Sequence, residues 1–188
     1  MYLVRKEALA LLEQQAQQGT IELYYGDESQ VSTEGYVPYG WQFADEQVCI
    51  ESAKGAGLNC FALISRDNRL SYATSQETVT ADFVVEQLDK FSLALSKPTV
   101  VVLDNARIHT ATKVKRALEG WQNRGLYLFY LPPYSPHLNL AERLWKELKA
   151  RWLKPEDYTT GQLLFYQVSL ALAAVGKELI INFSHFAS

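Results

Sequence analysis

The stretch TVVVLDN (residues 99–105) places an acidic residue directly after the most hydrophobic run of the chain. An unbroken run of apolar and β-branched residues predicts a strand in the middle of a sheet that helices cover on both faces. Asp104, which follows the strand, loses solvation unless a cation or several hydrogen-bond donors compensate its charge. The stretch therefore predicts a layered α/β fold and a carboxylate that faces a ligand.

A second acidic residue follows a proline-rich loop in LPPYSPHLNLAERLW (131–145). The loop leads into a helix expected over 139–153, which carries Glu142 in its first turn. Asn139 and Glu142 have the spacing of a capping box, in which Glu142 would only bind the backbone amide of Asn139. The same position favours an ionised carboxylate, as a metal ligand must be. Both interpretations stay open.

A third acidic residue, Asp27, follows a strand expected over 21–25. The sequence from Gly26 to Ser29 also suits a turn, in which Asp27 would have no further role. Adjacent strand residues face opposite sides, so only one of Asp27 and Glu28 could reach a common site. Together, Asp27, Asp104 and Glu142 predict a site for divalent cations that act on phosphates.

Strands are expected over 21–25, 35–43, 58–64, 70–73, 99–103 and 126–130, and helices over 2–18, 80–95, 110–120, 139–153 and 160–175. Leu3, Ala8, Leu11 and Leu12 would form the inner stripe of the first helix. This order of elements predicts an α/β protein with a ribonuclease-H-like fold, in which helices cover both faces of a mixed five-stranded sheet. His109 could orient a phosphate or a carboxylate, or pack at a helix start, and we favour the packing role.

The charge of this 188-residue chain is unevenly distributed around a net value of −3. Residues 105–154 carry 10 Lys and Arg against 3 Asp and Glu, whereas residues 1–104 carry 7 against 15. A basic zone beside clustered acids suits a site that holds metal and binds a polyanion, although a solvated basic helix face is the alternative. The residues expected to bind the DNA backbone are Lys113, Lys115, Arg116, Arg143, Lys146 and Lys149.

Other features exclude several classes of protein. Hydrophobic residues make up 48% of the chain, but no apolar run approaches a membrane span, and the N-terminus has no signal-peptide pattern. Cys49 and Cys60 lack the spacing of zinc ligands and suit a reducing compartment. We therefore expect a globular cytoplasmic protein, associated with the nucleoid.

Three motifs, YYGDES (24–29), VVLDNARIHT (101–110) and LPPYSPHLNLAERLWKELK (131–149), resemble the signature blocks of a known family. That family is the DDE endonuclease domain of mariner-superfamily transposases, in particular its bacterial insertion-sequence branch. The resemblance covers about residues 20–155. It implies a ribonuclease-H-like fold, two Mg²⁺ or Mn²⁺ ions, and DNA cleavage and strand transfer at transposon ends. By the same resemblance, Asp27, Asp104 and Glu142 would be the catalytic, metal-binding triad.

The chain departs from the family pattern at Leu140 and Ala141, where relatives have Pro and Ile. We expect a linking helix (1–19) that would follow a separate or missing DNA-binding region, a catalytic domain (20–176) and a loosely held tail (177–188). Expected partners are double-stranded DNA, a separate helix-turn-helix chain and a second copy of the chain, with Trp121 and Trp152 as candidate contacts. The alternatives are a ribonuclease, and an inactive or repurposed copy that binds DNA or protein.

Overall fold

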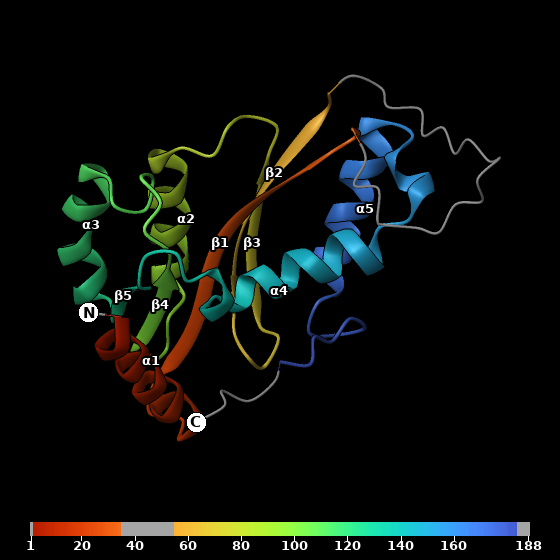
Figure 1. Ribbon diagram of the computed structural model, residues 1–188. Coiled ribbons are helices and arrows are strands. Elements are labelled where there is room, and N and C mark those ends of the chain that lie inside the picture. Colours follow the sequence, from red (N-terminus) through yellow and green to blue (C-terminus); the bar gives the residue numbers. More distant parts are fainter. Residues whose placement is uncertain (1, 35–54, 184–188) are drawn as a thin grey trace.

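The computed structural model describes residues 2–34 and 55–183, which form a five-stranded mixed sheet between two layers of helices (Figure 1). The sheet order is β3-β2-β1-β4-β5. This confirms the predicted mixed five-stranded sheet with helices on both faces. The strands are β1 (Glu22–Ser32), β2 (Gly57–Ile64), β3 (Leu70–Ser75), β4 (Thr99–Leu103) and β5 (Leu126–Tyr130). The helices are α1 (Tyr2–Gln17), α2 (Ala81–Leu93), α3 (Thr112–Asn123), α4 (Leu140–Glu147) and α5 (Gly161–Ala174).

The register of the sheet determines where the acidic residues lie. β1 pairs antiparallel with β2 and parallel with β4, and β4 pairs parallel with β5. All five residues of β4 are buried, as the sequence predicts for a central strand. The last parallel pair of β1 and β4 joins Tyr25 to Val102. Because Asp27 and Asp104 each lie two residues further along, the register places them side by side where β4 ends.

Alternate residues of β1 belong to the two hydrophobic cores, one on each face of the sheet. Tyr25 packs in the core under α1, α4 and α5, whereas Tyr24 packs in the core under α2 and α3. The start of α2 follows the prediction, since the hydroxyl of Thr80 accepts a hydrogen bond from the amide of Phe83. The two faces of the sheet therefore carry different helices, and odd-numbered residues of β1 face α4.

β1 runs well past its predicted end. The strand continues to Ser32, so Asp27 lies in its interior and is paired with Ala62 of β2. The sequence GDES looks like a turn, but Gly26 serves a different purpose. A Cβ at Gly26 would lie 2.6 Å from a methyl of Leu103 and 2.9 Å from a methyl of Leu63. Close packing against these leucines, rather than a turn, explains the glycine.

The inner face of α1 differs from the prediction. Leu3 and Leu11 are 68% and 61% exposed, whereas Leu9 and Glu13 are buried. The carboxylate of Glu13 accepts a hydrogen bond from the hydroxyl of Tyr25 and pairs with Arg66. A buried polar contact therefore sets the rotation of the helix, and an apolar stripe cannot reveal it.

Contrary to the prediction, the two tryptophans are not exposed. Trp121 of α3 is only 1% exposed, because it packs into one core and donates a hydrogen bond to Asp89, and Trp152 packs against the other core. Neither is an exposed aromatic available for dimer contacts. Of the tail predicted over 177–188, the structure describes residues up to 183, and within that part Ile181 is buried and its backbone is hydrogen-bonded to the side chain of Asn68.

The helix predicted over 139–153 is α4 followed by a wider π turn, Leu148–Trp152. The amide of Leu153 donates to the carbonyl of Leu148 at 3.0 Å, five residues back. This wider turn brings both leucines into one core. The strand predicted over 35–43 lies outside the described residues, as does Cys49. No helix in the described part of the chain is long and apolar enough to span a bilayer.

Candidate active site

Asp27, Asp104 and Glu142 line one pocket of about 440 Å³. The pocket lies where β1 and β4 pass the start of α4, and residues 131–136 of the proline-rich loop form its other wall. Within residues 2–34 and 55–183, no three acidic, histidine or cysteine side chains are already grouped closely enough to hold a metal ion. The three carboxylates therefore share a pocket without being in contact.

Asp104 is oriented through one of its two oxygens. Its Oδ1 accepts a hydrogen bond from the amide of Ala106 at 2.9 Å and lies 2.7 Å from Nδ1 of His109. The hydrogen bond to His109 holds the pKa of Asp104 below its ordinary value. Among the described residues, nothing donates a hydrogen bond to Oδ2. Asp104 is therefore ionised and keeps one oxygen available to a ligand.

His109 is fully buried between two carboxylates. Its Nε2 forms an ion pair with Oε2 of Glu28 at 3.1 Å, opposite the contact with Asp104. Burial lowers the pKa of His109, but the two carboxylates outweigh burial and raise it to about 9. His109 is buried, as the packing role predicts, but its imidazolium also orients Asp104.

Asp27 faces α4, whereas its neighbour Glu28 faces His109, as the alternation of a strand predicts. The indole Nε1 of Trp145, one turn after Glu142 in α4, donates to Oδ2 of Asp27 at 3.1 Å. Burial and the charges of Glu142, Glu28 and Asp104 raise the pKa of Asp27 to about 7. Its ionised form is thus held in an unfavourable field that a cation would relieve.

Glu142 does not form the capping box. Asn139 caps α4 alone, because its Oδ1 accepts from the amide of Ala141 at 3.1 Å, while its own amide donates to the carbonyl of Pro136 at 2.8 Å. Glu142 is exposed, and its side chain makes neither a hydrogen bond nor an ion pair with any described residue. Its carboxylate is therefore able to turn toward a ligand in the pocket.

Two asparagines connect the elements of the pocket, a role that the sequence does not predict for either of them. Nδ2 of Asn139 donates to the carbonyl of Gly26 at 3.0 Å, which ties the start of α4 to β1 beside Asp27. Asn105, next to Asp104, donates through Nδ2 to the carbonyl of Leu131 and so ties the end of β4 to the proline-rich loop. Both act across more than 25 residues of sequence, and only their motif context suggests a role.

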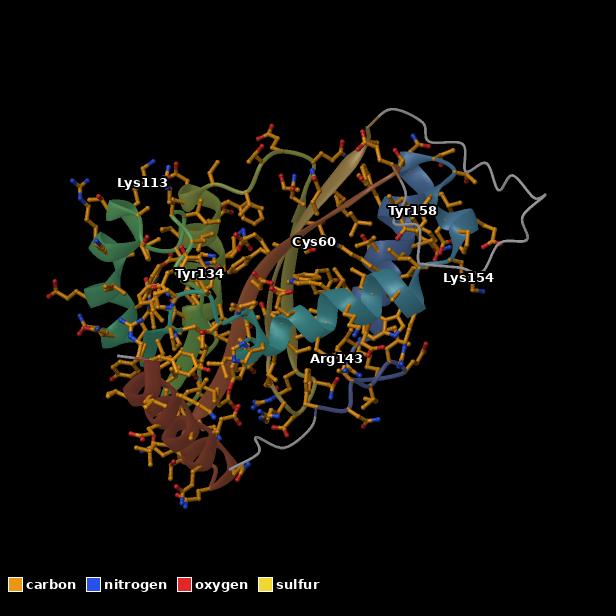
Figure 2. The ribbon with its side chains drawn as sticks, viewed as in Figure 1. Cys60, Lys113, Tyr134, Arg143, Lys154 and Tyr158 are labelled. Carbon is orange, nitrogen blue, oxygen red and sulfur yellow. The ribbon has the colours of Figure 1, made fainter. Side chains whose placement is uncertain are left out.

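The predicted DNA-binding residues fall into two groups on opposite faces of the sheet. Lys146 and Lys149 line a second pocket that also includes Asp27 and Glu142. Arg143 is on the same helix but pairs with Glu147 at 2.8 Å. In Figure 2, Lys113 lies on α3, well apart from Arg143 on α4.

The α3 group, Lys113, Lys115 and Arg116, is exposed on α3, a helix that packs beside α2. Lys113 pairs with Asp82 at 2.6 Å. Of the six, only Lys146 and Lys149 therefore line a pocket together with the acids. Lys149 is half-buried there, and burial lowers its pKa. The role of all six basic residues stays a prediction.

The chemistry of the pocket fits divalent metal ions. Its donors are carboxylate oxygens, which are the ligands that Mg²⁺ and Mn²⁺ prefer. Two of the three are oriented by neighbours, Asp104 by His109 and Asp27 by Trp145. No described cationic side chain forms an ion pair with Asp27 or Glu142. A bound cation would supply the missing positive charge.

A comparison with models of protein families identifies the family of the chain. The model described as DDE superfamily endonuclease matches residues 22–163, a stretch that includes all three carboxylates. The chain therefore belongs to the DDE superfamily endonuclease family. No curated protein sequence matches the chain. Its place in the bacterial insertion-sequence branch stays a prediction.

Solved structures share the fold. In the Mos1 strand transfer complex, 61% of the matched chain aligns with 92% of this chain at a TM-score of 0.51 and 18% identity. The catalytic core domain of BIV integrase aligns at a TM-score of 0.52 and 15% identity, over 84% of this chain and 85% of that one.

A third match is the simian T-cell lymphotropic virus intasome in complex with the PP2A regulatory subunit B56 gamma. It has a TM-score of 0.53 and 12% identity, over 85% of this chain and 50% of that one. The chain thus spans about three fifths of the Mos1 chain and half of the intasome chain. These similarities show the ribonuclease-H-like fold of transposase and integrase cores.

Proposed function

We propose that this chain is a transposase catalytic domain that cleaves and joins DNA strands with Mg²⁺ or Mn²⁺. Asp27, Asp104 and Glu142 would hold two ions, and the substrates would be the ends of a mobile element and target DNA. The matched Mos1 structures include a strand transfer complex and a paired-end complex with Mn. A second copy of the chain would process the other end, because both ends must be cut in concert.

The observation that carries this proposal is the environment of Asp27. Three acidic residues from β1, β4 and α4 line one pocket, and their mutual repulsion contributes to raising the pKa of Asp27 to about 7. Such a cluster is costly unless a cation binds there. Family membership supports the proposal, because the matched residues 22–163 contain all three motifs.

The residues of the chain have separate roles in this mechanism. His109 and the amide of Ala106 hold Oδ1 of Asp104, so that Oδ2 would be available to hold an ion. Trp145 fixes Asp27 in the same way through Oδ2. Bound Mg²⁺ would lower the pKa of a water molecule and stabilise charge on the departing 3′ oxygen. Lys146 and Lys149, beside the acids, would hold the DNA backbone through its phosphates.

Nicking of supercoiled plasmid DNA in Mn²⁺ tests the proposal. We expect the chain to nick the plasmid, Asp104→Asn to lose this activity while keeping its circular dichroism spectrum, and Glu119→Gln to retain it. Glu119 is a matched control because it is exposed on α3, across the sheet from the pocket. Full nicking by Asp104→Asn would remove Asp104 from the mechanism. Preferential cleavage of an RNA–DNA hybrid would instead indicate a ribonuclease.

A further inference from the structure

Tyr134 is an aromatic residue at the mouth of the acidic pocket that the proposed chemistry does not use. It lines the same pocket as Asp27, Asp104 and Glu142, yet its side chain is 100% exposed. Figure 2 labels it on the segment that joins β5 to α4. Buried aromatic rings stabilise a fold, but this ring has no contact that would do so.

The backbone of Tyr134 is in an unusual conformation. Its φ of 56° lies in the left-handed region, where a bulky residue other than glycine is an outlier. Only one other non-glycine residue of the described chain, Asn68, has a positive φ, and asparagine tolerates it. A tyrosine held there without any packing for its ring points to a role outside the fold.

The two ends of the loop are fastened to the site. On one side, the amide of Leu131 donates to the carbonyl of Leu103 at 2.9 Å, and Asn105 binds the carbonyl of Leu131. On the other side, Asn139 donates through Nδ2 to the carbonyl of Gly26 at 3.0 Å, and the buried Ser135 closes the loop by donating through its hydroxyl to the carbonyl of Pro133 at 3.2 Å. The ring of Tyr134 is therefore presented from a fixed support next to the carboxylates.

The pockets on either side of the acids define a path for a nucleic acid. Asp27 and Glu142 line both the pocket that contains Tyr134 and the pocket that contains Lys146 and Lys149. A DNA backbone held by the two lysines would pass the carboxylates and then reach the tyrosine ring.

We propose that Tyr134 stacks on an unpaired base of the DNA next to the cleaved phosphate and so positions the strand end. This inference rests on the proposed function and adds a specific substrate contact to it. A base offers a flat π-face that an exposed aromatic ring can cover, whatever the sequence. Because the ring alone is needed, phenylalanine should replace tyrosine, whereas a residue without a ring should not.

Three variants separate the ring from the loop conformation. Tyr134→Phe keeps the ring, Tyr134→Ala removes it, and Tyr134→Asn removes it while tolerating the left-handed backbone. The probe is a DNA duplex with a short overhang that carries 2-aminopurine, whose fluorescence changes on stacking. Binding is measured with Ca²⁺, and nicking of the same duplex is measured with Mn²⁺.

We expect the wild type and Tyr134→Phe to change the fluorescence of the probe equally, and the Ala and Asn variants to lose this change. The KM for nicking should rise about tenfold to a hundredfold in the Ala and Asn variants, the range for loss of one base–aromatic stack. Thermal stability should not fall in any variant, because the ring packs against nothing.

Two results would overturn the inference. One is an unchanged fluorescence signal and KM in the Ala and Asn variants, while the wild type still nicks DNA, which would leave the proposed function intact. The other is a loss of thermal stability that accounts for the rise in KM. If the wild type stacks the probe but never nicks it, the stacking stands and the proposed function fails.

Discussion

Replacement of Asp27 by asparagine should make the metal-free protein more stable near pH 8. The pKa of Asp27 is raised from 3.8 to about 7 in the folded chain, mainly by burial and by Glu142. The folded state therefore binds this proton more tightly than the unfolded state. The stability that the proton contributes is present below about pH 4 and is lost as the pH rises to about 7.

The size of the effect follows from the pKa shift. A shift of about 3 units at about 1.4 kcal/mol per unit sets an upper limit of about 4 kcal/mol. Solvent penetration and relaxation of Glu142, which is exposed, reduce this limit to an expected gain of about 1–3 kcal/mol. Asparagine is nearly isosteric with aspartate and retains an acceptor for the indole of Trp145.

Urea unfolding followed by tryptophan fluorescence measures this difference. In EDTA, the wild type should lose stability between about pH 4 and pH 7, whereas Asp27→Asn should not show this loss. Addition of Mg²⁺ at about 100 times its dissociation constant should raise the stability of the wild type at pH 8 by about 2.7 kcal/mol. The same addition should have little effect on the variant.

Glu119→Gln is the control, since it removes one exposed carboxylate far from the pocket. It should behave as the wild type at both pH values, with and without Mg²⁺. Equal or lower stability of Asp27→Asn at pH 8 in EDTA would refute the electrostatic reasoning. Equal stabilisation of wild type and variant by Mg²⁺ would show that the ion binds elsewhere.

Three more predictions concern the packing around the site and the reactivity of a buried cysteine. Gly26→Ala should cost about 1–3 kcal/mol in urea unfolding, because the new methyl would overlap two leucine methyl groups. Asn139→Ala should cost about 1–2 kcal/mol by removing the cap of α4, and it should also weaken Mn²⁺ binding measured by calorimetry, since the tie to β1 is lost. Burial raises the pKa of the Cys60 thiol to about 12, so peptide mapping after iodoacetamide treatment at pH 8 should find Cys60 labelled only when urea is present.

Local sequence features were sufficient where the determining contacts are local. The run 99–103 predicts a buried central strand because its composition suits no other environment, and Thr80 and Asn139 mark helix starts because caps act over two or three residues. Asp104 and Glu142 reach the pocket because a strand end and a helix start position them, as the sequence predicts, whereas Asp27 reaches it from the interior of β1.

Contacts between distant segments explain the rest. Trp145 meets Asp27 across 118 residues, and no periodicity signals that pairing. The length of β1 depends on its pairing with β2, and the rotation of α1 depends on the buried contact between Glu13 and Tyr25. The motif after Asp104 points to His109, but the sequence does not predict that this side chain lies between two carboxylates.

Diffraction from crystals grown with Mn²⁺, recorded at the manganese absorption edge, tests the metal site most directly. We expect anomalous density in the pocket, in contact with oxygens of Asp27, Asp104 and Glu142, with Glu142 turned inward from its exposed position. Density at no site, or at a site that leaves out Asp27 and Asp104, would contradict the central claim that these carboxylates together bind the catalytic metal.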